Sequence, residues 1–110
     1  LTYGGTSWTA SSDLRLKNVT GSFTNALNDV DALQAIKFTW KSDSTNKPCV
    51  GLSAQSVQKV IPEAVDSSKF INGDSTEYLG VRYTEIIPLL VAAIQELNAQ
   101  IKTLQSKVGV

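Results

Sequence analysis

Apolar residues near the end of the chain recur in alternating steps of three and four. They are Ile87, Leu90, Ile94, Leu97, Ile101, Leu104 and Val108. This heptad spacing predicts a helix at about Thr84–Val108, capped by Thr84, with a narrow apolar seam that packs against copies of itself. Ile86, Leu89 and Val91 widen the apolar face, so the first two turns are expected to pack on the rest of the chain. Isoleucine followed by leucine along the seam favours dimers in parallel model coils, so the seam alone leaves the number of chains open.

Two shorter segments upstream also have helical spacing. One helix is expected at about Thr24–Ala35, with Ser22 or Thr24 as its cap. A second is expected at about Ser53–Ile61, because Pro62 disfavours helical backbone in the residue before it.

Alternating patterns between the helices predict short strands. Residues 36–41 alternate, with Ile36, Phe38 and Trp40 on the inner face. A polar turn then leads into Cys49–Leu52, which indicates an antiparallel hairpin, and Tyr78–Tyr83 is a further strand. The pattern as a whole predicts the α+β class, in which a small mixed domain of short strands and short helices precedes a long C-terminal helix.

Composition removes several classes of function. The chain has 110 residues, enough for one domain, and its ten basic and ten acidic residues give a net charge of zero. That balance offers no electrostatic basis for binding nucleic acid or an anionic membrane, and no apolar run is long enough to span a bilayer. With no histidine and a single cysteine, Cys49, neither a cysteine–histidine metal site nor an internal disulfide is expected, and no cofactor is predicted.

The segment Ser12–Lys17 places a hydroxyl, a carboxylate, a guanidinium and an amine within six residues. A serine becomes a nucleophile when a base takes its proton, and a lysine serves as that base when burial or cationic neighbours favour its neutral form. The alternative is a solvated edge strand with Leu14 and Leu16 pointing inward. In an extended strand Ser12 and Lys17 point to opposite faces, so a reacting pair needs either a turn between them or a lysine from a neighbouring subunit.

Several motifs in order resemble one known family. They are Ser12-Asp13-x-Arg15-x-Lys17, Ala26-Leu27, Phe38-Thr39-Trp40-Lys41, Gly51-Leu52-Ser53-Ala54-Gln55, Pro62-Glu63, Tyr83-Thr84 and the run from Pro88 to Leu97. Each is weak alone, but their order and spacing are similar to the C-terminal intramolecular chaperone domain of phage tail fibres, tail spikes and endosialidases, the peptidase S74 family. The resemblance extends from Ser12 to about Leu104.

The resemblance implies a parallel homotrimeric coiled coil that helps an upstream β-rich fibre domain of the same chain to fold in the host bacterial cytoplasm. It also implies self-cleavage between Ser11 and Ser12, with Ser12 as nucleophile, Lys17 as base, and Asp13 and Arg15 in support. Residues 1–11 would then end the upstream region, and residues 12–110 would form the chaperone domain, absent from the mature virion once cut. Alternatives are a trimerisation cap that stays attached, the autoprocessing domain of a membrane-bound eukaryotic transcription factor, and, ranked last, a hydrolase of other proteins.

Overall fold

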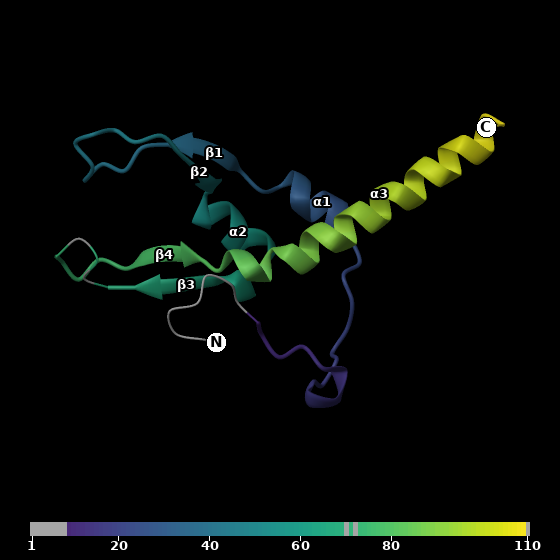
Figure 1. Ribbon diagram of the computed structural model, residues 1–110, viewed down its shortest axis with the longest axis horizontal. Coiled ribbons are helices and arrows are strands. Elements are labelled where there is room, and N and C mark those ends of the chain that lie inside the picture. The colour runs from purple at the N-terminus through teal and green to yellow at the C-terminus, as the bar shows by residue number, and fades with distance from the viewer. Residues whose placement is uncertain (1–8, 70, 72, 110) are drawn as a thin grey trace.

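The computed structural model describes residues 9–69, 71 and 73–109. Most of the expected upstream segment 1–11, residues 1–8, lies outside the described residues. The elements follow in the order α1 (Ala26–Asp31), β1 (Ala35–Phe38), β2 (Cys49–Leu52), α2 (Ala54–Val60), β3 (Val65–Ser68), β4 (Tyr78–Val81) and α3 (Ile87–Lys107), with short 3-10 turns η1 (Leu14–Leu16), η2 (Pro62–Ala64) and η3 (Tyr83–Glu85). Helix α1 lies beside α3 and α2 lies near the start of α3, both hairpins extend beyond that start, and the second half of α3 projects in the opposite direction (Figure 1).

The strands form two separate antiparallel hairpins, β1–β2 and β3–β4. Ala35 pairs with Leu52 and Phe38 with Cys49 in the first, and Val65 pairs with Val81 in the second. The predicted α+β class and its short antiparallel strands are therefore confirmed. The expectation that Trp40 faces inward is wrong: β1 ends at Phe38, and Trp40 is 61% exposed, with its ring edge-on to that of Phe38.

The middle helices are shorter than predicted. The helix expected at about Thr24–Ala35 is only α1, with Asn25 as its N-cap and no side-chain cap from Ser22 or Thr24. It ends early because Ala35 already pairs in β1. The helix expected at about Ser53–Ile61 is confirmed as α2, where the Ser53 hydroxyl caps the first turn by accepting the Ser56 N–H.

The long C-terminal helix is confirmed, but it begins later than predicted. A 3-10 turn, η3, occupies residues 83–85, so Thr84 is not the N-cap, and α3 starts at Ile87 after Ile86. Pro88 lies in the first turn, where a missing N–H costs no helical hydrogen bond. Val108 is the C-cap of α3 rather than part of its last turn.

A small apolar core joins the first half of α3 to α1, α2 and η2. Its buried members are Ala26, Val57, Ile61, Ala64, Ile86, Leu89 and Ala93. Ile86 and Leu89 are buried as predicted, whereas Val91 is 48% exposed and Ala93 takes its place. The largest fully buried side chains are only Leu89 and Val57, so one chain alone has little core to stabilise it.

Candidate functional site

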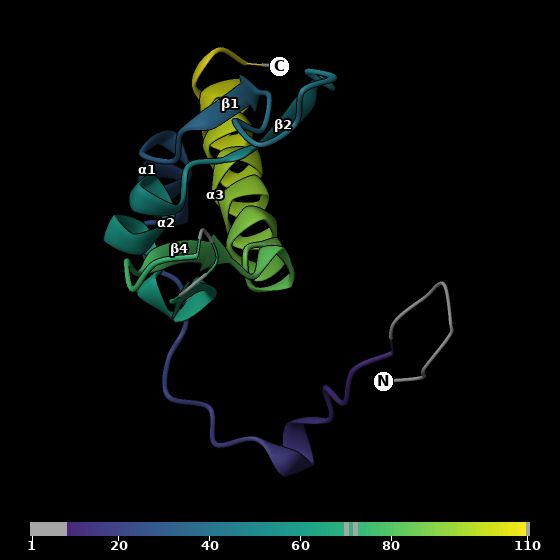
Figure 2. The same cartoon turned by 90° about the vertical axis from the view of Figure 1, so that its left-hand side faces the viewer.

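Residues 9–25 form an N-terminal arm that leads into α1. Every residue of this arm is exposed to solvent. Figure 2 shows the arm leaving the body below α1 and turning back on itself through η1. Leu14, Leu16 and Val19 are each at least 70% exposed, so the arm presents apolar side chains that nothing in the described chain covers.

A 3-10 turn, η1, sets the backbone conformation of the candidate six-residue segment Ser12–Lys17 within the arm. The Asp13 carboxylate accepts the Arg15 N–H at 2.9 Å, and the Asp13 carbonyl accepts the Leu16 N–H at 3.0 Å. A second backbone bond joins the Lys17 N–H to the Leu14 carbonyl at 3.1 Å. The alternative of an extended edge strand with inward leucines is therefore wrong, because Asp13 caps a turn and both leucines are exposed.

The turn brings the side chains of Ser12 and Lys17 together. Lys17 Nζ donates a hydrogen bond to Ser12 Oγ at 2.7 Å. An extended strand would have separated these side chains onto opposite faces, whereas the turn brings them to the same side. A turn within one subunit, one of the two arrangements left open by the sequence, is thus compatible with the chain's geometry.

Arg15 and Asp13 form a second pair beside the first. Arg15 donates through Nε to both carboxylate oxygens, at 3.1 and 3.3 Å, and through Nη2 to Oδ2 at 2.7 Å. The Arg15 side chain, followed by its backbone N–H, holds the pKa of Asp13 below the ordinary carboxyl value. The same ion pair raises the pKa of Arg15. Both predicted supporting residues thus bind each other rather than Lys17.

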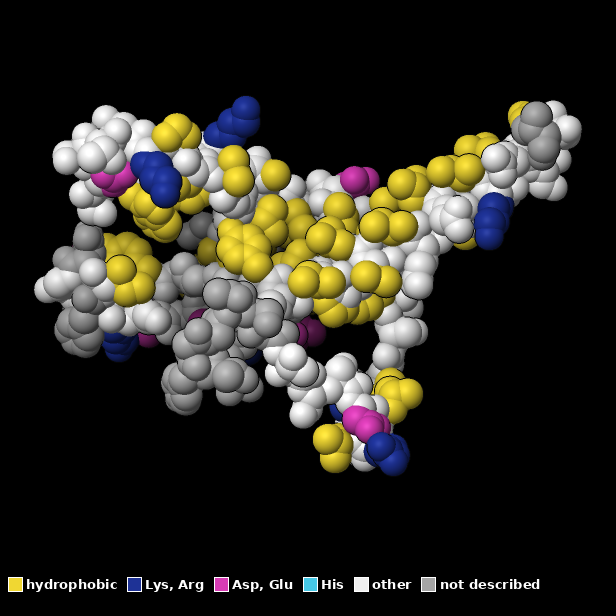
Figure 3. Space-filling view, in the orientation of Figure 1, with side chains coloured by type: hydrophobic (Ala, Val, Ile, Leu, Met, Phe, Trp, Pro, Cys, Tyr) yellow, Lys and Arg dark blue, Asp and Glu magenta, His cyan; other side chains and the backbone are white. Residues whose placement is uncertain are grey.

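Helix α3 carries two apolar stripes on different faces. The buried stripe consists of Ile86, Leu89 and Ala93, and in each case the next residue belongs to the predicted seam. One residue is about 100° of helical rotation, so the seam lies on the flank of the helix, beside the stripe that faces the core. The exposed fractions along the seam are 56% for Ile87, 41% for Leu90, 65% for Ile94, 44% for Leu97, 45% for Ile101, 59% for Leu104 and 71% for Val108. Apolar side chains line the projecting half of the helix in Figure 3.

Glu96 makes a helix-capping contact that the sequence analysis does not predict. Its carboxylate accepts the N–H groups of Ala26 at 2.6 Å and of Leu27 at 3.3 Å, which caps the first turn of α1. A carboxylate also suits the positive end of a helix. Asn25 makes no side-chain cap, and Glu96 lies 70 positions beyond Ala26 along the chain, so no local sequence pattern indicates this contact.

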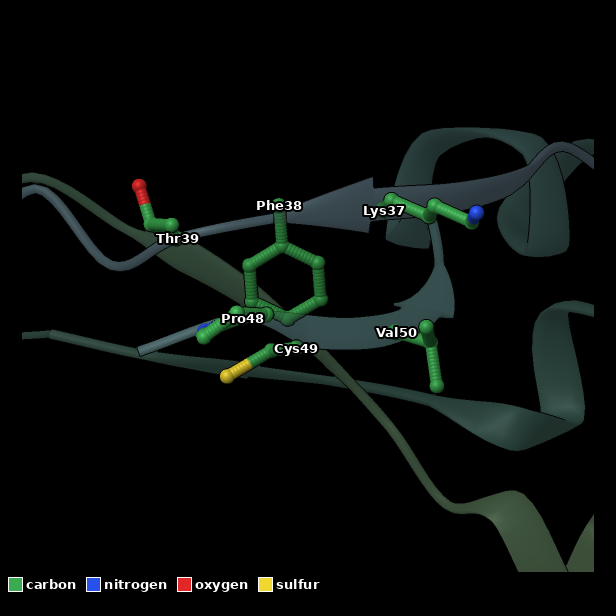
Figure 4. Close-up of a pocket in the computed structure, with 6 residues that line it drawn as sticks. All are labelled: Lys37, Phe38, Thr39, Pro48, Cys49 and Val50. Atoms are coloured by element: carbon green, nitrogen blue, oxygen red, sulfur yellow. The ribbon is translucent and has the colours of Figure 1, made fainter. Parts of the chain in front are cut away.

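The described residues offer no rival catalytic centre. A hollow on the β1–β2 hairpin is lined by Lys37, Phe38, Thr39, Pro48, Cys49 and Val50 (Figure 4). No hydrogen bond among the described residues joins a nucleophile to a base there, and the half-buried Cys49 thiol donates to the Lys47 carbonyl. Within residues 9–69, 71 and 73–109, no group of three or more acidic, histidine or cysteine side chains could hold a metal, and no helix is long and apolar enough to cross a membrane.

Known proteins similar to this chain were found at the level of a family and of individual relatives. The model of the Peptidase S74 family, described as the chaperone of endosialidase, matches residues 12–66. The long tail fiber protein Gp37 of Enterobacteria phage K3 is 34% identical over 99 residues, which cover 87% of this chain and 8% of that protein. Gp37 of Enterobacteria phage T2 is also 34% identical over 99 residues, covering 87% of this chain and 7% of the relative. The chain thus spans less than a tenth of the length of these relatives.

Proposed function

Because the chain belongs to the Peptidase S74 family, the chaperone of endosialidase, we propose that it is the intramolecular chaperone of a phage tail fibre or tail spike. In this proposal three copies assemble through the seam of α3, help the upstream β-rich part of the fibre to fold, and then release themselves by autoproteolysis between Ser11 and Ser12. The observation that carries the proposal is the hydrogen bond between Lys17 Nζ and Ser12 Oγ, next to the bond to be cut.

Assembly through the seam follows from its chemistry. An unbroken heptad of isoleucine and leucine that is 41% to 65% exposed in one chain gains free energy when copies bury it. A β-rich fibre has many contacts between distant residues and folds slowly, so its unpaired strand edges are prone to aggregate. Holding three chains together raises their effective concentration and keeps them in register.

The cut is proposed as an acyl shift followed by hydrolysis. Lys17, as a neutral amine, takes the proton of the Ser12 hydroxyl, and Ser12 Oγ attacks the carbonyl carbon of Ser11. The carbon–nitrogen bond breaks, the Ser12 nitrogen receives the proton, and an ester joins Ser11 to Ser12 Oγ. Water then opens the ester, which leaves a carboxylate on Ser11 and a free amine and hydroxyl on Ser12.

This chemistry needs a neutral lysine amine, and the proposal supplies it through assembly. Lysine is ordinarily protonated at neutral pH, and burial favours the neutral form. The whole arm is exposed in one chain, including its leucines at 72% and 77%. Covering those side chains against neighbouring subunits or the upstream fibre would also shield Lys17. Cleavage is therefore expected to follow assembly rather than precede it.

Mass spectrometry of the chain and its variants tests the proposal. The native chain is expected to give fragments that end at Ser11 and begin at Ser12, while Ser12→Ala and Lys17→Ala stay intact. Lys17→Arg is expected to stay intact as well, because a guanidinium remains protonated. Ser11→Ala is the matched control and is expected to cut normally. A fragment that begins at residue 12 in Ser12→Ala would falsify the nucleophile assignment.

The second candidate function is a trimerisation cap that stays attached to the fibre. The complete exposure of the candidate dyad in a single chain favours it, because a solvated lysine is a poor base. If the native chain forms trimers and remains intact, this candidate replaces self-cleavage.

A further inference from the structure

We propose that Arg15 is a positioning residue that binds the Asp13 carboxylate and so prevents Asp13 from holding Lys17 in its protonated form. This inference rests on the proposed function, since it concerns the base of the same dyad. In this proposal the segment Ser12–Lys17 contains two pairs of side chains with different roles. Ser12 and Lys17 react, while Asp13 and Arg15 shape the turn and cancel each other's charge.

The geometry gives Asp13 two separate tasks. Its Oδ1 accepts the Arg15 backbone N–H at 2.9 Å, which closes the turn that brings Lys17 to Ser12. Its two oxygens also accept the Arg15 guanidinium, with a shortest distance of 2.7 Å. An asparagine can cap a turn as well as an aspartate. The carboxylate charge is therefore not needed for the turn, and it has to be neutralised by another residue.

The charge of Asp13 matters because of what else the arm contains. Asp13, Arg15 and Lys17 are the only charged residues between positions 9 and 25. Lys17 makes no ion pair with any described residue, and its amine contacts the Ser12 hydroxyl instead. An unpaired carboxylate four residues away would favour the ammonium form and weaken the base. With Arg15 bound to Asp13, Lys17 has a neighbouring pair with no net charge.

Arginine suits this task better than lysine. Its planar guanidinium binds both carboxylate oxygens at once, and it stays protonated at any pH at which Lys17 could be neutral. A lysine at position 15 would itself lose its proton in the same pH range as Lys17. Arg15→Lys is therefore expected to recover the turn but only part of the effect on charge.

An NMR titration tests the inference without relying on cleavage. The side chain of Lys17 is followed in the full chain carrying Ser12→Ala, so that all samples stay intact. Arg15→Gln is expected to raise the titration midpoint of Lys17 by about half a pH unit, roughly a threefold change in the neutral fraction, as for a unit charge several ångströms away in water. Asp13→Asn is expected to lower it by a similar amount. The double variant is expected to return close to the starting value.

Two controls separate this effect from a loss of structure. Arg82→Gln removes the arginine that pairs with Asp66 and is expected to leave Lys17 unchanged. Lys102, on the second half of α3, is an internal reference in every sample. If Arg15 only stabilised the turn, neither single variant would shift the midpoint in its predicted direction, and the double variant would not recover. Unchanged midpoints in both single variants would overturn the inference.

The pH dependence of cleavage gives a second readout. Arg15→Gln is expected to move the rising limb of the rate to higher pH by the same half unit, and Asp13→Asn to lower pH. An equal loss of rate at every pH would assign Arg15 a purely structural role and overturn the inference. A native chain that never cuts would overturn the proposed function instead, while the NMR titration would still decide the role of Arg15.

Discussion

The carboxylate of Glu96 accepts the backbone N–H of Ala26 at 2.6 Å, and this bond ties α1 to the long helix α3. Glu96 lies between Ile94 and Leu97 of the seam, but its carboxylate reaches the buried Ala26 on the core side of the helix. The arm that carries Ser12 and Lys17 leads directly into α1. One hydrogen-bonded carboxylate therefore anchors the arm to the helix that we propose assembles the trimer.

Removing this carboxylate is expected to destabilise the chain. Glu96→Ala leaves the first N–H groups of α1 without a partner, so we expect a loss of about 1–2 kcal/mol in the free energy of unfolding. Gln95→Ala is the matched control, since Gln95 is exposed one position earlier on the same helix. Thermal and urea unfolding would measure both. Equal stability of the two variants would mean that the cap contributes nothing.

A second prediction concerns the close approach of Tyr83 to Gly51. A methyl group on Gly51 would lie 2.7 Å from the Tyr83 hydroxyl, which accepts the Leu52 N–H at 3.0 Å. Gly51→Ala is therefore expected to displace the end of the exposed Tyr83 side chain and to break its hydrogen bond, at a cost of about 0.5–1.5 kcal/mol in unfolding free energy. Gly21→Ala is the matched control, because nothing lies within 4 Å of the added methyl.

The double variant tests the stated cause. Tyr83→Phe removes the hydroxyl that clashes, so Gly51→Ala is expected to cost less in that background than in the native chain. A strictly additive pair, measured by urea unfolding of all four proteins, would show that Tyr83 is not what the methyl group meets.

The sequence predicts the fold best where one pattern repeats over many residues. The seven seam positions specify α3 and its unpaired face, and the alternation around Phe38 specifies the first hairpin. The start of α3 was missed because Thr84 is a good cap by residue type, while the backbone there forms a 3-10 turn. Trp40 was placed inward because the alternation continues in the sequence after pairing with β2 has stopped.

The candidate site was predicted in its residues but not in its geometry. Residue types alone indicated a Ser12–Lys17 pair, yet they left open how the two side chains could meet. The answer depends on Asp13 capping a single turn, a local event that an alternating pattern of leucines conceals. The cap from Glu96 is a long-range contact, and no local pattern in a single sequence indicates it.

The pairing of Asp13 with Arg15, which strengthens the turn in the arm, is expected to be lost only in acid. Hydrogen bonds from the Arg15 side chain and then its backbone hold the pKa of Asp13 below its ordinary value of 3.8. Because the pKa of Asp13 is lowered in the folded arm, the ionised carboxylate stabilises the turn fully above pH 3.8. This stabilisation is lost as the pH falls through the lowered pKa. Amide shifts of Arg15 and Leu16 are therefore expected to stay constant from neutral pH to about pH 4 and to move below it.

The corresponding control is Asp13→Asn, which keeps a capping oxygen but has no charge to lose. Its Arg15 and Leu16 amides are expected not to move with pH over the same range. The loop around Asp43 also titrates at low pH, because hydrogen bonds from Thr45 lower the pKa of that carboxyl, so the arm has to be followed at its own residues. A midpoint at or above 3.8 in the native arm would contradict the proposed pairing.

The seam gives the prediction that links assembly to cleavage. Ile94 and Leu97 are 65% and 44% exposed in one chain, so replacing both with glutamine is expected to leave the fold of a single chain intact. The same change would bury polar amides in a coiled-coil seam, where each lacks a partner, and is expected to abolish assembly. In sedimentation experiments the native chain is expected to behave as three copies and the double variant as one.

Alanine at Gln95 and Asn98, exposed neighbours outside the seam, is expected to change neither mass nor cleavage. Because the arm becomes covered only on assembly in our proposal, the glutamine variant is also expected to stay uncut. Cleavage at the native rate in a monomeric variant would separate the dyad from the trimer, and it would leave Lys17 acting as a base while exposed to solvent.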